Sequence, residues 1–130
     1  MSEVSVPGTT TVERDGNTIV WHNETFDVSV GEAEAIDRAV RQRASEDGVK
    51  AVLVDNSAAS GAWDPEINEL WKELMEWFAA AGLRSATVCP SSVNAMQINQ
   101  LARQTGTEET IRAFEESEGA AAREFVGLDE

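Results

Sequence analysis

Several residue types that carry chemistry are scarce in this chain of 130 residues. Cys89 is the single cysteine, which excludes an internal disulfide and favours a reducing compartment. His22 is the single histidine, and strand geometry separates its side chain from the nearby Glu24 and Asp27. One histidine and one cysteine far apart do not form a zinc site. We therefore expect no metal, and we interpret His22 as a surface residue at the end of a strand.

Long apolar runs are also lacking. No run approaches the roughly 20 residues that a membrane-spanning helix requires, so we expect no stable membrane anchoring. Residues 1–16 show no basic start followed by an apolar segment, which predicts no secretory signal. The length favours a single domain over residues 1–130, with 1–8 as a loose lead-in and a cytoplasmic location.

Positive charge is scarce as well. The chain has ten Lys and Arg residues against 24 Asp and Glu residues, which gives a formal net charge of −14. Only Lys50 and Lys72 are lysines. Binding to a phosphate backbone needs clustered basic residues, so nucleic acid is not an expected partner. The acids are dispersed along the chain, which favours adaptation to a high-salt cytoplasm and hence a halophilic source. The alternative is an acidic surface that binds a basic partner.

Catalytic constellations are missing too. Cys89-Pro90-Ser91-Ser92 lies between a strand pattern and a helix pattern, a place where thiols are activated and anions bind. A phosphatase loop would need an arginine six residues after the cysteine, but that position is Ala95. We also find no nucleophile–base pair and no glycine-rich phosphate loop. We therefore expect neither enzymatic activity nor a cofactor.

Alternating strand and helix patterns fill the chain. An Asp15-Gly16 turn between two β-branched runs predicts an N-terminal hairpin. Ser29 and Glu32 are spaced as a capping box at the start of a helix. The expected elements are strands at 9–13 and 18–21, a helix at 29–47, a strand at 49–54, a helix at 64–81, a strand at 83–89, a helix from about 91 to 105, a short strand or helical turn at 109–114, and a final helix at 117–128. This order predicts an α/β fold with a largely parallel sheet.

Residues 49–78 form the centre of this pattern. An apolar strand ends in Asp55, a loop of small residues follows, and Asp64-Pro65 begins a helix with the residue types typical of a cap and a first turn. Apolar residues recur at three- and four-residue steps along this helix, which gives it one broad apolar face. They are Ile67, Leu70, Trp71, Leu74, Met75, Phe78 and Ala81.

Four features in a fixed order resemble the STAS superfamily, and more closely its SpoIIAA-like branch, which is often grouped with Sec14-like lipid-binding domains. They are the hairpin with its capped helix, the strand VKAVLVD at 49–55 followed by NSA, the strand RSATV at 84–88, and the tail with IRAF at 111–114 and AREFV at 122–126. The likeness covers about residues 9–128. It implies a SpoIIAA-like (STAS) sandwich with a mixed, mostly parallel sheet, an N-terminal hairpin and about four helices.

The resemblance also bears on regulation. Sporulation-type members are switched by phosphorylation of a serine at the start of the helix that follows the Asp-ending strand. The matching segment here, AWDPE at 62–66, has no hydroxyl side chain, and Ser57 and Ser60 lie earlier in the loop. Asp64 supplies a built-in negative charge at this position, which a helix amino terminus favours.

Two hypotheses of function follow. The first is a non-enzymatic binding or regulatory module that acts through contacts with a protein partner or with itself as a homodimer. Its predicted contact loop comprises Asp55, Ser57, Ser60, Gly61, Trp63 and Asp64. The second is a small apolar-ligand or lipid-binding domain of Sec14-like type. Its predicted groove is lined by Trp71, Trp77 and Phe78, which can equally belong to the core.

Overall fold

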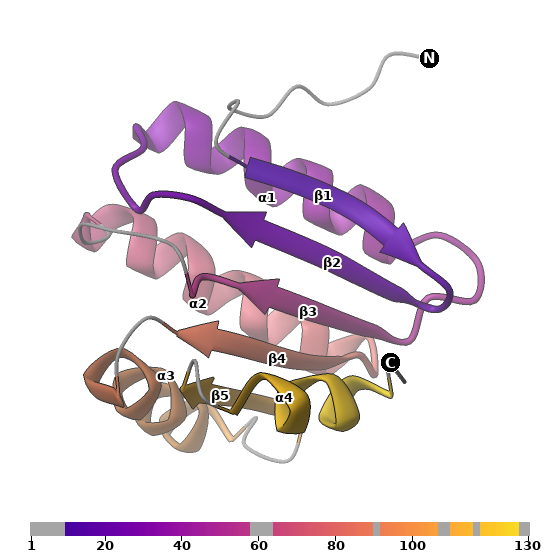
Figure 1. The fold of residues 1–130 in the computed structure, drawn as a ribbon. Coiled ribbons are helices and arrows are strands. Elements are labelled where there is room, and N and C mark those ends of the chain that lie inside the picture. The colour runs from indigo at the N-terminus through magenta and orange to yellow at the C-terminus, as the bar shows by residue number, and fades with distance from the viewer. Residues whose placement is uncertain (1–9, 58–63, 90–91, 107–109, 116–117, 128–130) are drawn as a thin grey trace.

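The computed structural model describes residues 10–57, 64–89, 92–106, 110–115 and 118–127 (Figure 1). These residues form an α/β fold, as the sequence predicts. The elements in chain order are β1 (Thr10–Asp15), β2 (Thr18–Asn23), α1 (Val30–Ala44), β3 (Ala51–Asp55), α2 (Pro65–Ala80), β4 (Arg84–Cys89), α3 (Ser92–Thr105), β5 (Ile111–Glu115) and α4 (Gly119–Val126). The segment predicted as a last strand or a helical turn is the strand β5.

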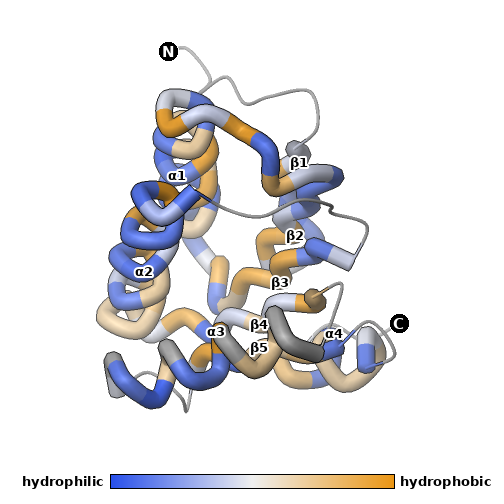
Figure 2. The backbone as a smooth tube through the Cα atoms, turned by 90° about the vertical axis from the view of Figure 1, so that its left-hand side faces the viewer, coloured by the Kyte–Doolittle hydropathy of each residue, from blue (hydrophilic) through white to orange (hydrophobic). Residues whose placement is uncertain are grey.

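The five strands form one sheet in the sequential order β1-β2-β3-β4-β5. β1 pairs antiparallel with β2, and the remaining neighbours pair parallel. Each crossover therefore steps to the next strand in the same direction. Since such crossovers are right-handed, α1, α2 and α3 all lie on one face of the sheet. α4 follows the last strand and packs on the opposite face, against β3, β4 and β5 (Figures 1 and 2).

Local hydrogen bonds explain where the first two helices begin. The Ser29 hydroxyl accepts from the Glu32 amide at 3.1 Å, and Glu32 Oε1 accepts from the Ser29 amide at 2.9 Å. This is the predicted capping box. Asp64 Oδ1 accepts from the Glu66 amide at 3.1 Å, and Pro65 occupies the first turn of α2. Both helix starts are thus specified by nearby side chains.

The core has two parts, one on each side of the sheet. The larger part lies between the sheet and the α1–α3 layer, where Figure 2 shows apolar segments of helix and strand facing each other. Its buried members include Ile19, Trp21, Ile36, Val40, Val52, Val54, Leu74, Phe78 and Ile111. The smaller part lies under α4 and comprises Ala51, Leu53, Ala86, Val88, Phe114, Ala122 and Val126. β3 contributes to both parts, which explains its nearly continuous apolar sequence.

Cys89 ends β4 and is buried. Burial raises the pKa of its thiol to about 12, so the reactive thiolate scarcely forms at neutral pH. This side chain packs with Ala95 and Ala113 as a small hydrophobic residue.

Within the described ranges, the helices are too short or too polar to cross a lipid bilayer.

Candidate functional site

The parallel pairing of β2 and β3 brings together two polar residues that lie 33 positions apart. His22 and Asp55 are register partners at the carboxyl ends of these strands. His22 Nδ1 lies 3.3 Å from Asp55 Oδ2. The prediction considered only Glu24 and Asp27 as neighbours of His22 and therefore missed this contact. The available signal was that both residues end strands expected to run parallel, which places them at the same edge of the sheet.

Asp55 also binds Ser57. Asp55 Oδ1 accepts hydrogen bonds from the Ser57 hydroxyl at 2.7 Å and from the Ser57 amide at 3.1 Å. We call His22, Asp55 and Ser57 the edge cluster. The serine donates to the aspartate rather than to the histidine, so this is not the serine–histidine arrangement that activates a nucleophile. The cluster instead holds three half-buried polar groups in one fixed geometry.

The electrostatics of the edge cluster favour an ionised aspartate. Partial burial by itself raises the pKa of Asp55, but the hydrogen bonds from the hydroxyl and amide of Ser57, together with His22, outweigh burial. The pKa of Asp55 is therefore below its ordinary value. The side chains of His22 and Asp55 remain 31% and 37% exposed. The Asp55 carboxylate is therefore accessible from solvent, and its hydrogen bonds to Ser57 and His22 fix its position.

A second polar group, which we call the asparagine brace, lies on the other face of the sheet. Asn23 Oδ1 accepts from Thr10 Oγ1 and from Trp21 Nε1, both at 3.0 Å. Asn23 Nδ2 donates to Asn56 Oδ1 at 2.8 Å. Both asparagines are buried. The brace ties β1 and β2 to the residue that follows β3, and so it fixes the strand ends that carry the edge cluster.

The predicted contact loop is placed in part. Asp55 and Ser57 belong to the edge cluster, and Asp64 is an exposed residue that caps α2. Ser60, Gly61 and Trp63 lie outside the described residues. The structure thus brings two of the predicted residues together and adds His22 to them.

The three residues of the predicted apolar groove lie on α2, facing the core. Phe78 is 1% exposed and belongs to the larger core. Trp71 and Trp77 are half-buried against the same core. Trp71 meets Trp21 edge to face with 5.1 Å between ring centroids, and the Arg41 guanidinium lies 5.3 Å from the Trp77 ring. Core packing uses the apolar surface of these side chains, and the groove stays a prediction.

In the part of the chain that the structure describes, no three His, Cys, Asp or Glu side chains gather into a group that could hold a metal ion.

Known proteins are similar to this chain in fold but not in sequence. No protein-family model matches the chain. No curated protein sequence matches it either. A solved structure described as the NMR structure of the protein TM1081 is similar, with a TM-score of 0.59 and 10% sequence identity. The similarity covers 85% of this chain and 83% of that one. The described residues thus form an α/β fold with a five-stranded mixed sheet and four helices, and this fold is similar to that of a known structure.

We expect the substitution Asp55→Asn to lower the free energy of unfolding at pH 7 by about 1 kcal/mol, because a half-exposed carboxylate loses its charge-assisted hydrogen bonds. The pKa of Asp55 is lower in the folded chain than in the unfolded chain. Its ionisation therefore stabilises the fold above the unfolded value, about pH 4, and this stabilisation is lost as the pH falls through the folded value. Urea unfolding at pH 7, 5 and 3 should show the difference between wild type and variant shrinking toward low pH.

The matched control for this measurement is Asp27→Asn, since Asp27 is an exposed residue near the same strand end. It should leave stability within about 0.5 kcal/mol of wild type. A difference for Asp55→Asn that stays constant between pH 7 and pH 3 would contradict the assigned ionisation.

Proposed function

We propose that this chain is a SpoIIAA-like (STAS) domain that acts as a binding or regulatory module through contacts with another protein. The support is the sequential sheet with its antiparallel first hairpin, three helices on one face and a last helix on the other. The motif order along the sequence agrees with this assignment. The proposal assigns no catalytic role to Ser57, whose hydroxyl donates a hydrogen bond to the Asp55 carboxylate, or to Cys89, whose thiol is buried and has a raised pKa.

The contact surface of this module is the carboxyl edge of β2 and β3. In open α/β sheets, ligands bind outside the carboxyl ends of the parallel strands. The proposal rests on the edge cluster, in which the partly exposed Asp55 is hydrogen-bonded to both His22 and Ser57. The buried asparagine brace holds the same strand ends from the opposite face of the sheet. Groups that are already ordered lose little conformational entropy when a partner binds, so they provide a prearranged recognition surface.

The hydrogen-bonding capacity of the cluster indicates what kind of group it recognises. Asp55 is an acceptor, and the Ser57 hydroxyl, whose hydrogen is engaged in the hydrogen bond to Asp55, presents its oxygen as a second acceptor. A partner surface that offers donors, such as amide N–H groups or a basic side chain, complements these two residues. The proposed partner is therefore a protein that presents hydrogen-bond donors to this edge.

A site-specific photo-cross-linker tests the proposal. Benzoylphenylalanine is incorporated in place of Ser57 and, as the control, in place of Asn17, which lies in the exposed turn at the other end of β2. We expect irradiation of cells to yield a discrete protein adduct at position 57 and none at position 17. Replacing His22 by the same cross-linker keeps Asp55 and Ser57 intact and should yield the same adduct.

Two results would overturn the proposed function. The first is equal cross-linking at positions 57 and 17, which would mean that the carboxyl edge is not a preferred surface. The second is a stoichiometric lipid in organic extracts of the purified protein, identified by mass spectrometry. That result would support the Sec14-like alternative instead.

A further inference from the structure

The strand β5 forms one edge of the sheet, since it comes last in the strand order and pairs with β4. The Ser85 amide donates to the Thr110 carbonyl at 2.7 Å. Because backbone groups alternate in direction along a strand, every second residue after Thr110 also points its backbone groups toward β4. The N–H and C=O groups of Ile111, Ala113 and Glu115 therefore point away from β4. Such outward groups on an edge strand are a template for pairing with another strand.

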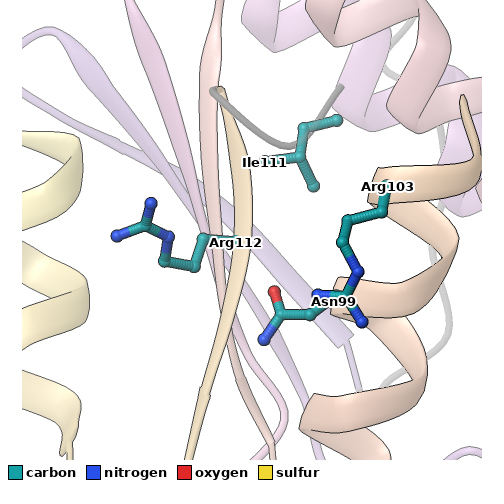
Figure 3. A pocket seen from close by; sticks show the side chains of 4 residues that line it. All are labelled: Asn99, Arg103, Ile111 and Arg112. Carbon is teal, nitrogen blue, oxygen red and sulfur yellow. The ribbon is translucent and has the colours of Figure 1, made fainter. Parts of the chain in front are cut away.

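The side chain of Asn99 occupies the outward groups at the middle of β5. Asn99 Oδ1 accepts from the Ala113 amide at 2.8 Å, and Asn99 Nδ2 donates to the Ala113 carbonyl at 3.2 Å. A residue of an adjacent antiparallel strand would exchange the same two bonds with Ala113. Figure 3 shows Asn99 extending from α3 toward β5, against which α3 packs. Asn99 thus takes the place of a neighbouring strand.

A second side chain continues this cover toward the end of β5. Glu118 Oε1 accepts from the Glu115 amide at 2.9 Å, and Glu118 directly precedes α4. We call Asn99 and Glu118 the β5 lock. A pocket of about 220 Å³ lies toward the amino end of β5 and is lined by Asn99, Arg103, Ile111 and Arg112. Space is therefore available beside the strand, so hydrogen bonds rather than bulk close this edge.

The sequence of β5 suits pairing with a second copy of the same strand. Three of its five residues are apolar, and the charges of Arg112 and Glu115 cancel. In a two-fold antiparallel pairing centred on Ala113, Arg112 would lie opposite Phe114 of the other copy, and Ile111 opposite Glu115. Like charges, which destabilise a strand pair, would then not face each other.

We propose that the β5 lock keeps this edge of the sheet from adding the β5 strand of a second copy of the chain. When Asn99 no longer bonds to Ala113, the backbone groups of Ala113 become available to the same groups of another copy. The lock therefore determines whether the sheet ends at β5 or continues into a second molecule. It is separate from the edge cluster, which lies on β2 and β3, so its failure leaves the proposed function untouched.

Amide hydrogen exchange, followed by NMR on dilute samples, tests the hydrogen bonds of the lock. In Asn99→Ala we expect the Ala113 amide to exchange at least about tenfold faster than in wild type. The Phe114 amide, which points toward β4, should change by less than about threefold because its strand pairing remains. Glu118→Ala should likewise speed the exchange of the Glu115 amide.

The matched control is Gln100→Ala, which removes an exposed amide side chain from the next position of α3. It should leave the exchange of the Ala113 amide unchanged. Two results would overturn the proposal. One is equal acceleration at Ala113 and Phe114 in Asn99→Ala, which would mean that Asn99 supports global stability alone. The other is the same acceleration at Ala113 in Gln100→Ala.

Sedimentation velocity tests whether the opened edge accepts a second copy. The measurement is made at about 1 M salt, where the Debye length is about 3 Å and repulsion between acidic copies is weak. We expect Asn99→Ala to add a concentration-dependent species of twice the wild-type mass, and its Ala113 amide to regain protection in concentrated samples. Circular dichroism checks folding, and Asn99→Ser, whose side chain is too short to bond both groups of Ala113, replaces the alanine variant if that one does not fold. A variant that keeps the wild-type mass at every concentration would overturn the proposal.

Discussion

The substitution Phe78→Ala should lower the free energy of unfolding by about 3–5 kcal/mol, because it removes a buried ring and leaves a cavity that its neighbours fill only in part. Phe78 is 1% exposed and is the largest fully buried side chain in the part of the chain that the structure describes. It lies on α2 in the larger core, with its ring centroid 5.8 Å from that of Trp77. Total stabilities of single domains are about 5–15 kcal/mol, so the variant should be only marginally folded. Urea unfolding followed by circular dichroism measures the change.

Two controls separate core packing from a ligand groove at this position. Phe78→Leu retains much of the apolar volume and should lose less stability than Phe78→Ala, by at least about 1.5 kcal/mol. Trp77→Ala should also lose less, because Trp77 is only partly buried. If Phe78→Ala instead keeps wild-type stability while the protein loses a co-purifying apolar ligand, Phe78 lines the predicted groove and is not part of the core.

The substitution Asn23→Ala should cost about 3 kcal/mol, since it removes three hydrogen bonds inside a buried network. The variant leaves Thr10, Trp21 and Asn56 without the partner to which each is bonded in the wild type. Unpaired polar groups in the interior retain their desolvation cost, so the loss exceeds that of an exposed hydrogen bond. Urea unfolding at pH 7 gives the magnitude.

Asn68→Ala is the control for this prediction because Asn68 is an exposed asparagine on α2. Its replacement should stay within about 0.5 kcal/mol of wild type. A change of less than about 1 kcal/mol for Asn23→Ala would mean that the asparagine brace adds little to stability and does not fix the strand ends beneath the edge cluster.

Much of the fold follows from patterns within short segments. The hairpin follows from Asp15-Gly16, and Gly16 has the positive φ of 64° that such a turn requires. The capping box at Ser29 and the start of α2 at Asp64 depend on atoms within three residues of each other. The apolar run at 51–54 predicts a strand covered on both faces, and β3 packs against both parts of the core. Such features are readable because the interactions that specify them are local.

The candidate site could be predicted only in part. Asp55 and Ser57 were recognisable because they follow an apolar strand at the edge where parallel strands end. His22 was not, since its contact with Asp55 depends on the register between β2 and β3, which is set by core packing on both strands. The brace is equally non-local, because Asn23 and Asn56 meet across the ends of two strands.

The sequence by itself determined the α/β order, the starts of α1 and α2, and the buried central strand. The tertiary structure decided which residues from separate segments lie together. It placed His22 beside Asp55 and Asn23 beside Asn56, and it brought the Arg112 guanidinium of β5 over the Phe125 ring of α4. The physical reason is that helix caps and turns depend on neighbours in the chain, whereas strand register and helix docking depend on the burial of the whole apolar core.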